Sequence, residues 1–477
     1  MKICLVAEGC YPYVAGGVAS WIQMLVAGTR DHTFSVFAIG AEKKMKGQYK
    51  YKLPENLTQV HEHFLDEAFE VKGRFRHARI SKAAEEALLN LFSGGEVRWE
   101  DVFDQFSGED AVKPNDFLRS ESYLRVITRL CGTDQYRNMP FKDVFWTVRS
   151  MLMPLLNLLS CPIPEADVYH SVSTGYAGIL AALFHYRTGK PFILTEHGIY
   201  SREREEEILK SDWVESSFKK TWIDFFGAMC RCSYTHADRI ISLFYGARDI
   251  QIALGAPPDK CGVIPNGINL RRFAAVQEIS LEPHPLAVGA IIRVVPIKDL
   301  KTMIQAFALL KAKRPDAHLY MLGPTDESPE YFAECQELIA ALDVKDIEFV
   351  GRVDVSQWME RLDMVILTSI SEGQPFVLLE AMAAHRPVLA TNVGSCKEII
   401  EGYRDDFGPA GVVTPVMNPP RIAEGMLRIG KDTAVMRALA QNGYNRVAAL
   451  YQDKDFLARY HRLYEEVRTS WQASASS

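Results

Sequence analysis

The chain has 477 residues, of which 48% are hydrophobic and 24% are charged, and its formal net charge is -6. This length predicts two large domains, and this composition is typical of a globular protein. The net negative charge leaves no basic footprint, which argues against nucleic acid as a partner.

The nine cysteines are scattered, and the closest pair, Cys230 and Cys232, lacks the C-x-x-C spacing of zinc and redox sites. We therefore expect reduced thiols in a cytosolic protein. The first apolar run, in MKICLVAEGC, stops at Glu8, which favours a first strand over a signal peptide. No apolar run approaches the roughly 18 residues that span a bilayer. A role at a membrane would therefore depend on partner proteins.

Strands and helices alternate from the start of the chain. A strand is expected at 3–7, a glycine-containing loop at 8–17, a helix that includes the apolar Trp21, and a strand at 34–40. This order begins a βαβ unit. Residues 62–165 break the alternation, because they are rich in helix formers of mixed charge. We expect a mostly helical insertion there.

The alternation returns with strands expected at 167–174, 191–198 and 237–244. After the natural hinge Pro265-Asn266-Gly267 it restarts with the strand PLAVGAIIRV and the helix KDLKTMIQAFALLKAKRP. A restart of this kind predicts a second doubly wound domain.

The predicted fold class is therefore α/β, with two Rossmann-like domains at 1–264 and 265–454. A last helix, at about 455–470, is expected to pack back on the N-terminal domain. Two such domains face each other across a cleft at the carboxyl ends of their strands, where ligands bind. This organisation suits a ligand that both domains share and that is long and anionic.

Two cations follow the first strand of the second domain. Arg293 and Lys298, in AIIRVVPIKDLKT, lie between a strand end and a helix that starts near Asp299. Such a loop offers backbone N–H groups and the positive end of a helix dipole, so it suits phosphate. Arginine adds a planar fork and lysine a point charge. The alternative is a pair of solvated surface cations.

Two glutamates frame the helix in SEGQPFVLLEAMAA. Glu372 ends a strand and loop, Gly373 permits close approach of a ligand, and Pro375 suits the first turn of a helix. The amides of residues 374–377 would then point into the cleft. Glu380, about one turn into the helix and among apolar neighbours, is a good acceptor for a diol. The alternatives are a charge at a helix start and a solvated helix face.

In the first domain, His197 ends a strand in TEHGIYSRERE, where it can donate to a substrate hydroxyl, although a lone histidine is more often structural. His170 in VYHSVST also lies at a strand end, and the case for a functional role is weaker there. Gly16 and Gly17 precede a helix and can hold phosphate through backbone N–H groups. The full G-x-G-x-x-G fingerprint is absent, as are a Walker lysine loop and a metal-binding cluster.

Together these motifs resemble the retaining GT-B glycosyltransferases of family 4. The likeness rests on Arg293 and Lys298 followed by Glu372-x7-Glu380, and it covers nearly the whole chain. Within that family the chain is most similar to the PelF group, the cytosolic glycosyltransferases of Pel exopolysaccharide synthesis. Five segments carry this likeness in order: EGCYPYVAGGVASW, TEHGIYSRERE, RVVPIKDLKT, SISEGQPFVLLEAMAA and GPAGVVTP. Ile292 and His385 stand where the family usually has glycine.

The resemblance implies a role for each matching residue. Arg293 and Lys298 would bind the donor diphosphate and stabilise the leaving UDP, and Glu380 would hold the ribose hydroxyls. Glu372 and His197 would contact the donor sugar. The other implied donor-site residues are Gly16 and Gly17 along the phosphates, Gln374, Phe376 and Val377 through their amides, and Arg352 at the uracil pocket.

The implied activity is transfer of a sugar from UDP-glucose, or a related UDP-hexose or UDP-HexNAc, to a growing exopolysaccharide of the Pel type. It would proceed with retention by front-side attack and without a required cofactor or metal. The implied setting is the cytoplasm, with recruitment by inner-membrane Pel synthase subunits that dock on the helical insertion. Two alternatives stay open: a UDP-HexNAc epimerase-like enzyme on the same fold, and a non-catalytic nucleotide-sugar-binding subunit of a membrane synthase complex.

Overall fold

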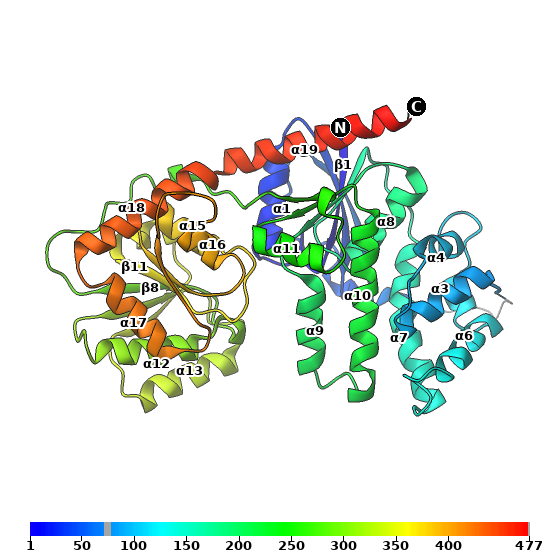
Figure 1. The fold of residues 1–477 in the computed structure, drawn as a ribbon, viewed down its shortest axis with the longest axis horizontal. Helices are drawn as coiled ribbons and strands as arrows, with labels where there is room; N and C mark the ends of the chain where they lie inside the picture. The colour runs from blue at the N-terminus through cyan, green and yellow to red at the C-terminus, as the bar shows by residue number, and fades with distance from the viewer. Residues whose placement is uncertain (71–77, 476–477) are drawn as a thin grey trace. The chain divides into compact units, whose positions relative to one another are not determined.

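The computed structural model describes residues 1–70 and 78–475. The chain forms two compact units (Figure 1). The first contains Met1–Ser242, Arg248–Val263 and Tyr460–Ser477, and the second contains Leu243–Ala247 and Ile264–Arg459. Each unit has a hydrophobic core of its own.

The first unit is built on a parallel sheet with the strand order β3-β2-β1-β4-β5-β6-β7. Its strands are β1 (Lys2–Glu8), β2 (Thr33–Gly40), β3 (Leu57–Phe64), β4 (Val168–Ser171), β5 (Phe192–Glu196), β6 (Arg239–Ser242) and β7 (Cys261–Val263). The apolar run of β1 is fully buried, as is typical of a central parallel strand. The strand order reverses between β1 and β4, and doubly wound sheets bind ligands at such a switch point.

Two groups of helices pack on this sheet. Helix α8 packs on β1 and β4 and is covered by α10, which also contacts α9. Helix α1 meets α19 through Trp21 and Tyr460. The helices of these groups are α1 (Gly17–Gly28), α8 (Tyr176–Thr188), α9 (Tyr200–Lys210), α10 (Lys219–His236) and α19 (Asp453–Ala475).

A helical layer lies between β3 and β4 in the sequence, where the insertion is expected. Its helices are α2 (Glu67–Glu70), α3 (Lys82–Ser93), α4 (Trp99–Phe106), α5 (Pro114–Phe117), α6 (Glu121–Cys131) and α7 (Phe141–Leu159). The prediction is wrong at its start, because residues 62–64 belong to β3, which pairs with β2. The sequence LTQVHEHF hides this strand, since β3 is an edge strand that buries few of its side chains.

The second unit is built on another parallel sheet, with the order β10-β9-β8-β11-β12-β13. Its strands are β8 (Ala287–Ile291), β9 (His318–Leu322), β10 (Ile347–Gly351), β11 (Met364–Leu367), β12 (Val388–Thr391) and β13 (Gly411–Thr414). The order reverses between β8 and β11, which are paired neighbours. This reversal is the switch point of the second sheet.

Helices lie on both faces of the second sheet. Helices α12, α13 and α17 cover one face, and α15, α16 and α18 cover the other (Figure 1). The helices of this unit are α12 (Leu300–Lys311), α13 (Pro329–Ala341), α14 (Val355–Trp358), α15 (Phe376–Ala383), α16 (Cys396–Glu401), α17 (Pro419–Ile429) and α18 (Thr433–Leu450). Helix α11 (Tyr245–Ala253) contributes to both units. Both units are thus doubly wound and parallel, which confirms the predicted α/β fold class.

The C-terminal helix α19 also contributes to both units. Its residues up to Arg459 belong to the second unit, and those from Tyr460 onward belong to the first. Tyr464 is fully buried there against the rings of Phe34 and His170. The last helix of the chain is therefore part of the core of the first unit.

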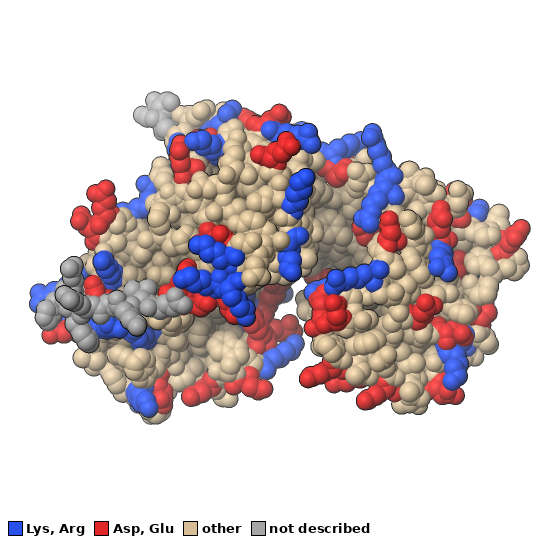
Figure 2. Space-filling model, turned by 180° about the vertical axis from the view of Figure 1, so that it is seen from behind, with Lys and Arg blue, Asp and Glu red and all other residues tan. Residues whose placement is uncertain are grey.

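The surface has no dominant charge on the face shown in Figure 2, where lysine and arginine are interspersed with aspartate and glutamate. Within residues 1–70 and 78–475, no helix is long and apolar enough to cross a membrane. All nine cysteines lie in the described part of the chain, and none of them forms a disulfide.

Candidate functional site

The predicted charged residues of the second domain lie at the switch point of its sheet. Arg293 and Lys298 follow β8, with Lys298 closing the short 3-10 turn η5 (Pro296–Lys298) before α12. Glu372 follows β11, the strand that pairs with β8. Adjacent parallel strands bring the loops at their carboxyl ends together, so these residues share one edge of the sheet.

Lys298 and Glu372 form an ion pair in which both side chains are largely buried. The accepting oxygen, Glu372 Oε1, also receives a hydrogen bond of 2.5 Å from Ser369 Oγ. Thr368 Oγ1 donates to the carbonyl of Lys298 at 3.1 Å, which ties the loop after β11 to the loop after β8. The ammonium group of Lys298 is thereby held in place at the switch point.

The loop of Glu372 is also held from the side of β12. Gly394 has a φ of 52°, and a Cβ there would lie 2.2 Å from the carbonyl oxygen of Glu372 and 2.4 Å from that of Gly373. Ser395 donates its backbone N–H to the carbonyl of Gly373 at 2.9 Å. This close approach requires glycine at position 394.

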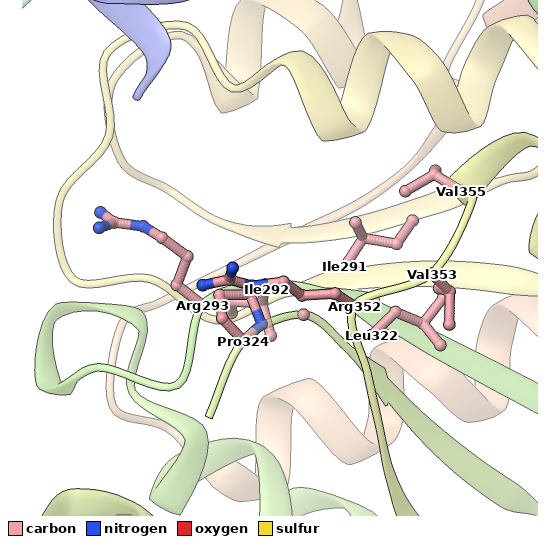
Figure 3. Close-up of a pocket in the computed structure, with 9 residues that line it drawn as sticks. Ile291, Ile292, Arg293, Leu322, Pro324, Arg352, Val353 and Val355 are labelled. Carbon is pink, nitrogen blue, oxygen red and sulfur yellow. The ribbon is translucent and has the colours of Figure 1, made fainter. Parts of the chain in front are cut away.

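Arg293 and Arg352 line a pocket of about 280 Å³ at the carboxyl ends of β8, β9 and β10. In Figure 3 the aliphatic side chains of Ile291, Val353 and Val355 lie on one side and the two guanidinium groups lie toward the other. Backbone edges at the strand ends and an apolar wall suit a planar ring, and the cations suit an anion beside it.

Both pocket arginines have a carboxylate partner on the loop between β9 and α13. Arg293 Nη1 donates to Glu327 Oε2 at 2.7 Å, and Arg352 Nη2 donates to Asp326 Oδ1 at 3.3 Å. Both arginines and Asp326 are at least half exposed and Glu327 is 34% exposed, so each pair contributes little to stability. An anionic ligand at Arg293 would therefore displace a weakly held carboxylate.

Glu380 lies on α15, four residues after its first residue Phe376, and its side chain is mostly buried. Burial raises the pKa of this carboxyl group, and Arg272 partly opposes the rise through its charge. Arg272 Nη1 donates to Glu380 Oε1 at 3.2 Å. A buried carboxylate with a single half-exposed partner has acceptor capacity to spare, which suits a pair of hydroxyl groups.

The start of α15 carries the three other residues predicted beside Glu372. Phe376 and Val377 are the first residues of the helix, and the N-cap Pro375 has no capping side chain. Their amides therefore have no partner within the helix. Gln374 turns its side chain away, since its Oε1 accepts the backbone N–H of Asn266 at 2.5 Å. The backbone carbonyl of Gln374 also accepts from Asn266 Nδ2, at 3.4 Å, so the side-chain oxygen and the carbonyl are both occupied.

Three predicted residues lie in the first unit, also at the carboxyl edge of its sheet. Gly16 and Gly17 are exposed at the start of α1, and Gly16 N donates to Tyr51 Oη at 3.4 Å. His197 follows β5, and burial lowers its pKa to about 3, so its imidazole is neutral at physiological pH. Its Nε2 is buried and has no hydrogen-bond partner among the described residues. His170 is a core residue, bonded to Tyr464 and Thr195.

Three residues at the site have no counterpart among the sequence predictions: Arg272, Asp326 and Glu327. Asp326 and Glu327 could have been found, because they follow Gly323-Pro324 just after a predicted strand. Arg272 carries no such pattern, since it lies in the 3-10 turn η4 (Leu270–Phe273) after the hinge. For a metal, the residues that the structure describes contain no suitable group of three or more His, Cys, Asp and Glu side chains.

Two family models match the chain. Residues 1–259 match the family described as "Domain of unknown function (DUF3492)", which is 259 of 477 residues. Residues 282–432 match "Glycosyl transferases group 1". The second match contains the loops after β8, β9, β10 and β11 that form the candidate site.

Relatives by sequence are glycosyltransferases. The MMP alpha-(1->4)-mannosyltransferase of Mycolicibacterium hassiacum is 22% identical over 309 residues, 63% of this chain and 71% of the relative. The N,N'-diacetylbacillosaminyl-diphospho-undecaprenol alpha-1,3-N-acetylgalactosaminyltransferase of Campylobacter jejuni is 25% identical over 276 residues, 55% of this chain and 69% of the relative. The match to the N-acetyl-alpha-D-glucosaminyl L-malate synthase of Bacillus anthracis spans 43% of that relative, at 27% identity.

Solved structures share the fold over nearly the whole chain. HepE of Anabaena, solved in complex with UDP and glucose, has a TM-score of 0.57 at 16% identity and covers 98% of this chain and 99% of its own. Sucrose-phosphate synthase of Thermosynechococcus elongatus has a TM-score of 0.60 at 14% identity, with 98% and 99% covered. By these matches the chain belongs to the DUF3492 family, carries a group 1 glycosyltransferase domain in its second unit, and is a glycosyltransferase of the GT-B fold.

Proposed function

We propose that the protein is a retaining glycosyltransferase that transfers a sugar from a UDP-sugar, UDP-glucose or a related UDP-hexose or UDP-HexNAc, to a growing exopolysaccharide. The observation that carries this proposal is the cluster at the switch point of the second sheet. Cations, helix-start amides and two carboxylates there follow adjacent strands. The complexes of HepE with UDP, glucose and UDP-glucose support the choice of donor.

The diphosphate would lie between Arg293 and Lys298. Breaking the glycosidic bond to UDP builds negative charge on the β-phosphate, and preorganised cations stabilise that charge where it develops. Lys298 is held by Glu372, and Arg293 exchanges Glu327 for phosphate. These two cations supply the positive charge that a divalent metal supplies in other transferases, so the proposed reaction requires no metal.

The nucleoside would occupy the pocket beside Arg352. The wall of Ile291, Val353 and Val355 suits the uracil ring, and Glu380 would accept from both ribose hydroxyls. Burial of Glu380 strengthens such hydrogen bonds, because little water surrounds its carboxylate and the local dielectric is low.

The first unit would contribute Gly16 and Gly17 along the phosphates, and His197 at the donor sugar. A neutral imidazole can donate or accept at Nε2, and that atom has no hydrogen-bond partner among the described residues. Glu372 would contact the donor sugar while it holds Lys298. The amides of Gln374, Phe376 and Val377 complete the proposed donor site.

We further propose that the polysaccharide is of the Pel type. The five motifs that resemble the PelF group support this, and the helical layer of the first unit would be the docking surface. In this proposal the enzyme works in the cytoplasm and is recruited by inner-membrane Pel synthase subunits.

Alanine variants test the donor site. We expect Arg293→Ala, Lys298→Ala and Glu380→Ala each to weaken UDP binding roughly 10- to 100-fold, because each loses a charge-assisted contact of about 1.5–3 kcal/mol. Isothermal titration calorimetry with UDP measures the change. The matched control is Arg421→Ala, which removes an exposed arginine paired with Glu424 on α17 in the same unit. Wild-type affinity in all three site variants would overturn the assignment.

Product analysis tests the reaction. Incubation with UDP-glucose, UDP-GlcNAc or UDP-GalNAc, with and without membranes that contain the synthase, should release UDP from one donor. A C2 epimer without release of UDP would replace the transferase with an epimerase. Binding of a UDP-sugar with no release of UDP, with membranes and acceptor present, would replace it with a non-catalytic subunit.

A further inference from the structure

Trp21 lies at a junction of three elements in the first unit. It is one helical turn after Gly17 on α1, and its side chain is fully buried. Its ring centroid is 4.7 Å from that of His197, at an interplanar angle of 85°, and 5.3 Å from that of Tyr460, at 84°. These are edge-to-face contacts, which favour one relative orientation of the rings. The same indole therefore contacts the loop of His197 and helix α19.

The far side of this junction is fixed by a chain of buried hydrogen bonds. Tyr464 Oη lies 2.7 Å from His170 Nδ1, and His170 Nε2 lies 2.8 Å from Thr195 Oγ1. Thr195 Oγ1 lies 3.1 Å from Tyr460 Oη. Burial lowers the pKa of His170 to about 3, so the ring is neutral and one nitrogen donates while the other accepts. The chain holds Tyr460 against Trp21.

His197 has no comparable anchor at its reactive atom. Its Nε2 is buried without a hydrogen-bond partner in the part of the chain that the structure describes. The next residue, Gly198, has no side chain, which leaves room for Glu203. The orientation of the ring therefore depends strongly on its packing against Trp21.

We propose that Trp21 is a positioning residue: it holds the His197 imidazole in the orientation that meets the donor sugar, and Tyr460 of α19 supports it from behind. This inference rests on the proposed function of His197. It also links the predicted phosphate loop at Gly16-Gly17 with His197, because Trp21 stands on the helix that this loop begins.

The first test compares Trp21→Phe with Trp99→Phe. Both remove the same atoms from a buried tryptophan of the first unit, but Trp99 lies on α4 and packs on Phe103. Hydrogen–deuterium exchange is measured by mass spectrometry at residues 196–201. We expect exchange there to rise severalfold in Trp21→Phe only. Equal exchange at 196–201 in both variants would overturn the proposal, whatever the activity of the enzyme.

The second readout is kinetic. With UDP-glucose as the probe and UDP release as the signal, Trp21→Phe should lower kcat about tenfold, as small misplacements of a catalytic group do. The dissociation constant for UDP should change much less than kcat, since Arg293, Lys298 and Glu380 lie in the second unit and only the proposed contacts at Gly16 and Gly17 lie in the first. A loss confined to UDP affinity would contradict a role at His197. If the wild-type protein neither binds UDP nor releases it from UDP-glucose, the proposed function fails and the exchange result still decides the role of Trp21.

The support from α19 is tested separately at Tyr460. Tyr460→Leu removes the ring that meets Trp21, whereas Tyr460→Phe keeps the ring and loses only the hydroxyl that bonds Thr195. We expect the leucine variant to reproduce the exchange change at 196–201 and the phenylalanine variant to restore most of the wild-type behaviour. Wild-type exchange in Tyr460→Leu would remove α19 from the proposal. The comparison of Tyr460→Leu with Tyr460→Phe also tests the proposal if the Trp21→Phe variant fails to fold.

Discussion

Histidines in this chain differ in chemistry because their surroundings differ. His170 and His197 are both at carboxyl ends of strands in the first unit, and burial lowers the pKa of each to about 3. His170 satisfies both ring nitrogens within the protein, whereas Nε2 of His197 has no partner among the described residues. The first arrangement is that of a structural residue and the second suits a ligand.

His170 and His197, whose pKa values are both lowered, predict an acid-sensitive first unit. Below pH 6.5 the unfolded chain binds a proton at each histidine, while the folded protein does not until about pH 3. Stability is therefore complete above pH 6.5 and falls as the pH decreases, by about 1 kcal/mol for each histidine between pH 6.5 and 5.5. Thermal unfolding between pH 7.5 and 5 measures this slope. His170→Gln should flatten it, because one of the two histidines with a lowered pKa is then gone. A slope equal to that of the wild-type protein would contradict the assignment.

At the scale of strands and their loops, the site is predictable where charge follows an apolar run. Arg293, Lys298 and Glu372 could be placed from the sequence, because strand ends of a parallel sheet share one edge. The side chains that pair with these residues could not be predicted, because the sequence alone does not give the order of strands in the sheet. The meeting of Glu327 with Arg293 depends on β9 lying beside β8.

The same limit applies to backbone conformation. His385 stands where the resemblance favours glycine, and its φ is 53°, in the left-handed region. Its ring stacks on Tyr444 at 4.1 Å, so side-chain packing offsets the strain that glycine would avoid. Ile292 replaces another expected glycine and is buried, with its N–H donating to Leu322 at 2.8 Å. Both positions therefore accommodate a side chain where the resemblance favours glycine.

The loop after β12 gives a test of how elements hold the site. Gly394→Ala would place a methyl group against the carbonyls of Glu372 and Gly373. We expect a loss of about 1–3 kcal/mol from the left-handed backbone alone, and a displaced Glu372 loop that weakens UDP binding at least about tenfold. Chemical denaturation and calorimetry with UDP measure the two effects. The control Gly189→Ala, at a φ of 66° with open space around it, should destabilise the fold without changing UDP affinity. Wild-type UDP affinity in Gly394→Ala would show that this contact does not hold the site.

On the scale of the whole molecule, each of the two units has its own core and carries different residues of the proposed site. The second unit holds the cations, the pocket and both carboxylates of the proposed donor site. The first unit holds His197, the glycine loop and the helical layer, which shares its core with the sheet. Helices α11 and α19 contribute residues to both units, so neither unit is a continuous piece of the chain. The sequence predicted two domains with a hinge near Pro265, but α11 has no sequence feature that shows its residues divided between them.

This division predicts where UDP protects the protein. At a UDP concentration of 100 times the dissociation constant, binding adds about 2.7 kcal/mol of stability. Hydrogen–deuterium exchange should therefore slow in the second unit at 291–298, 322–328, 350–355 and 369–380, the strand-end loops of the site. In the first unit we expect slower exchange only around Gly16 and Gly17, and none in α3 to α7. Uridine is the matched control, because it should protect 350–355 through the base and leave 291–298 unchanged without a diphosphate to bind. Protection confined to the first unit, or equal protection by uridine and UDP at 291–298, would mean that Arg293 and Lys298 do not hold the phosphates.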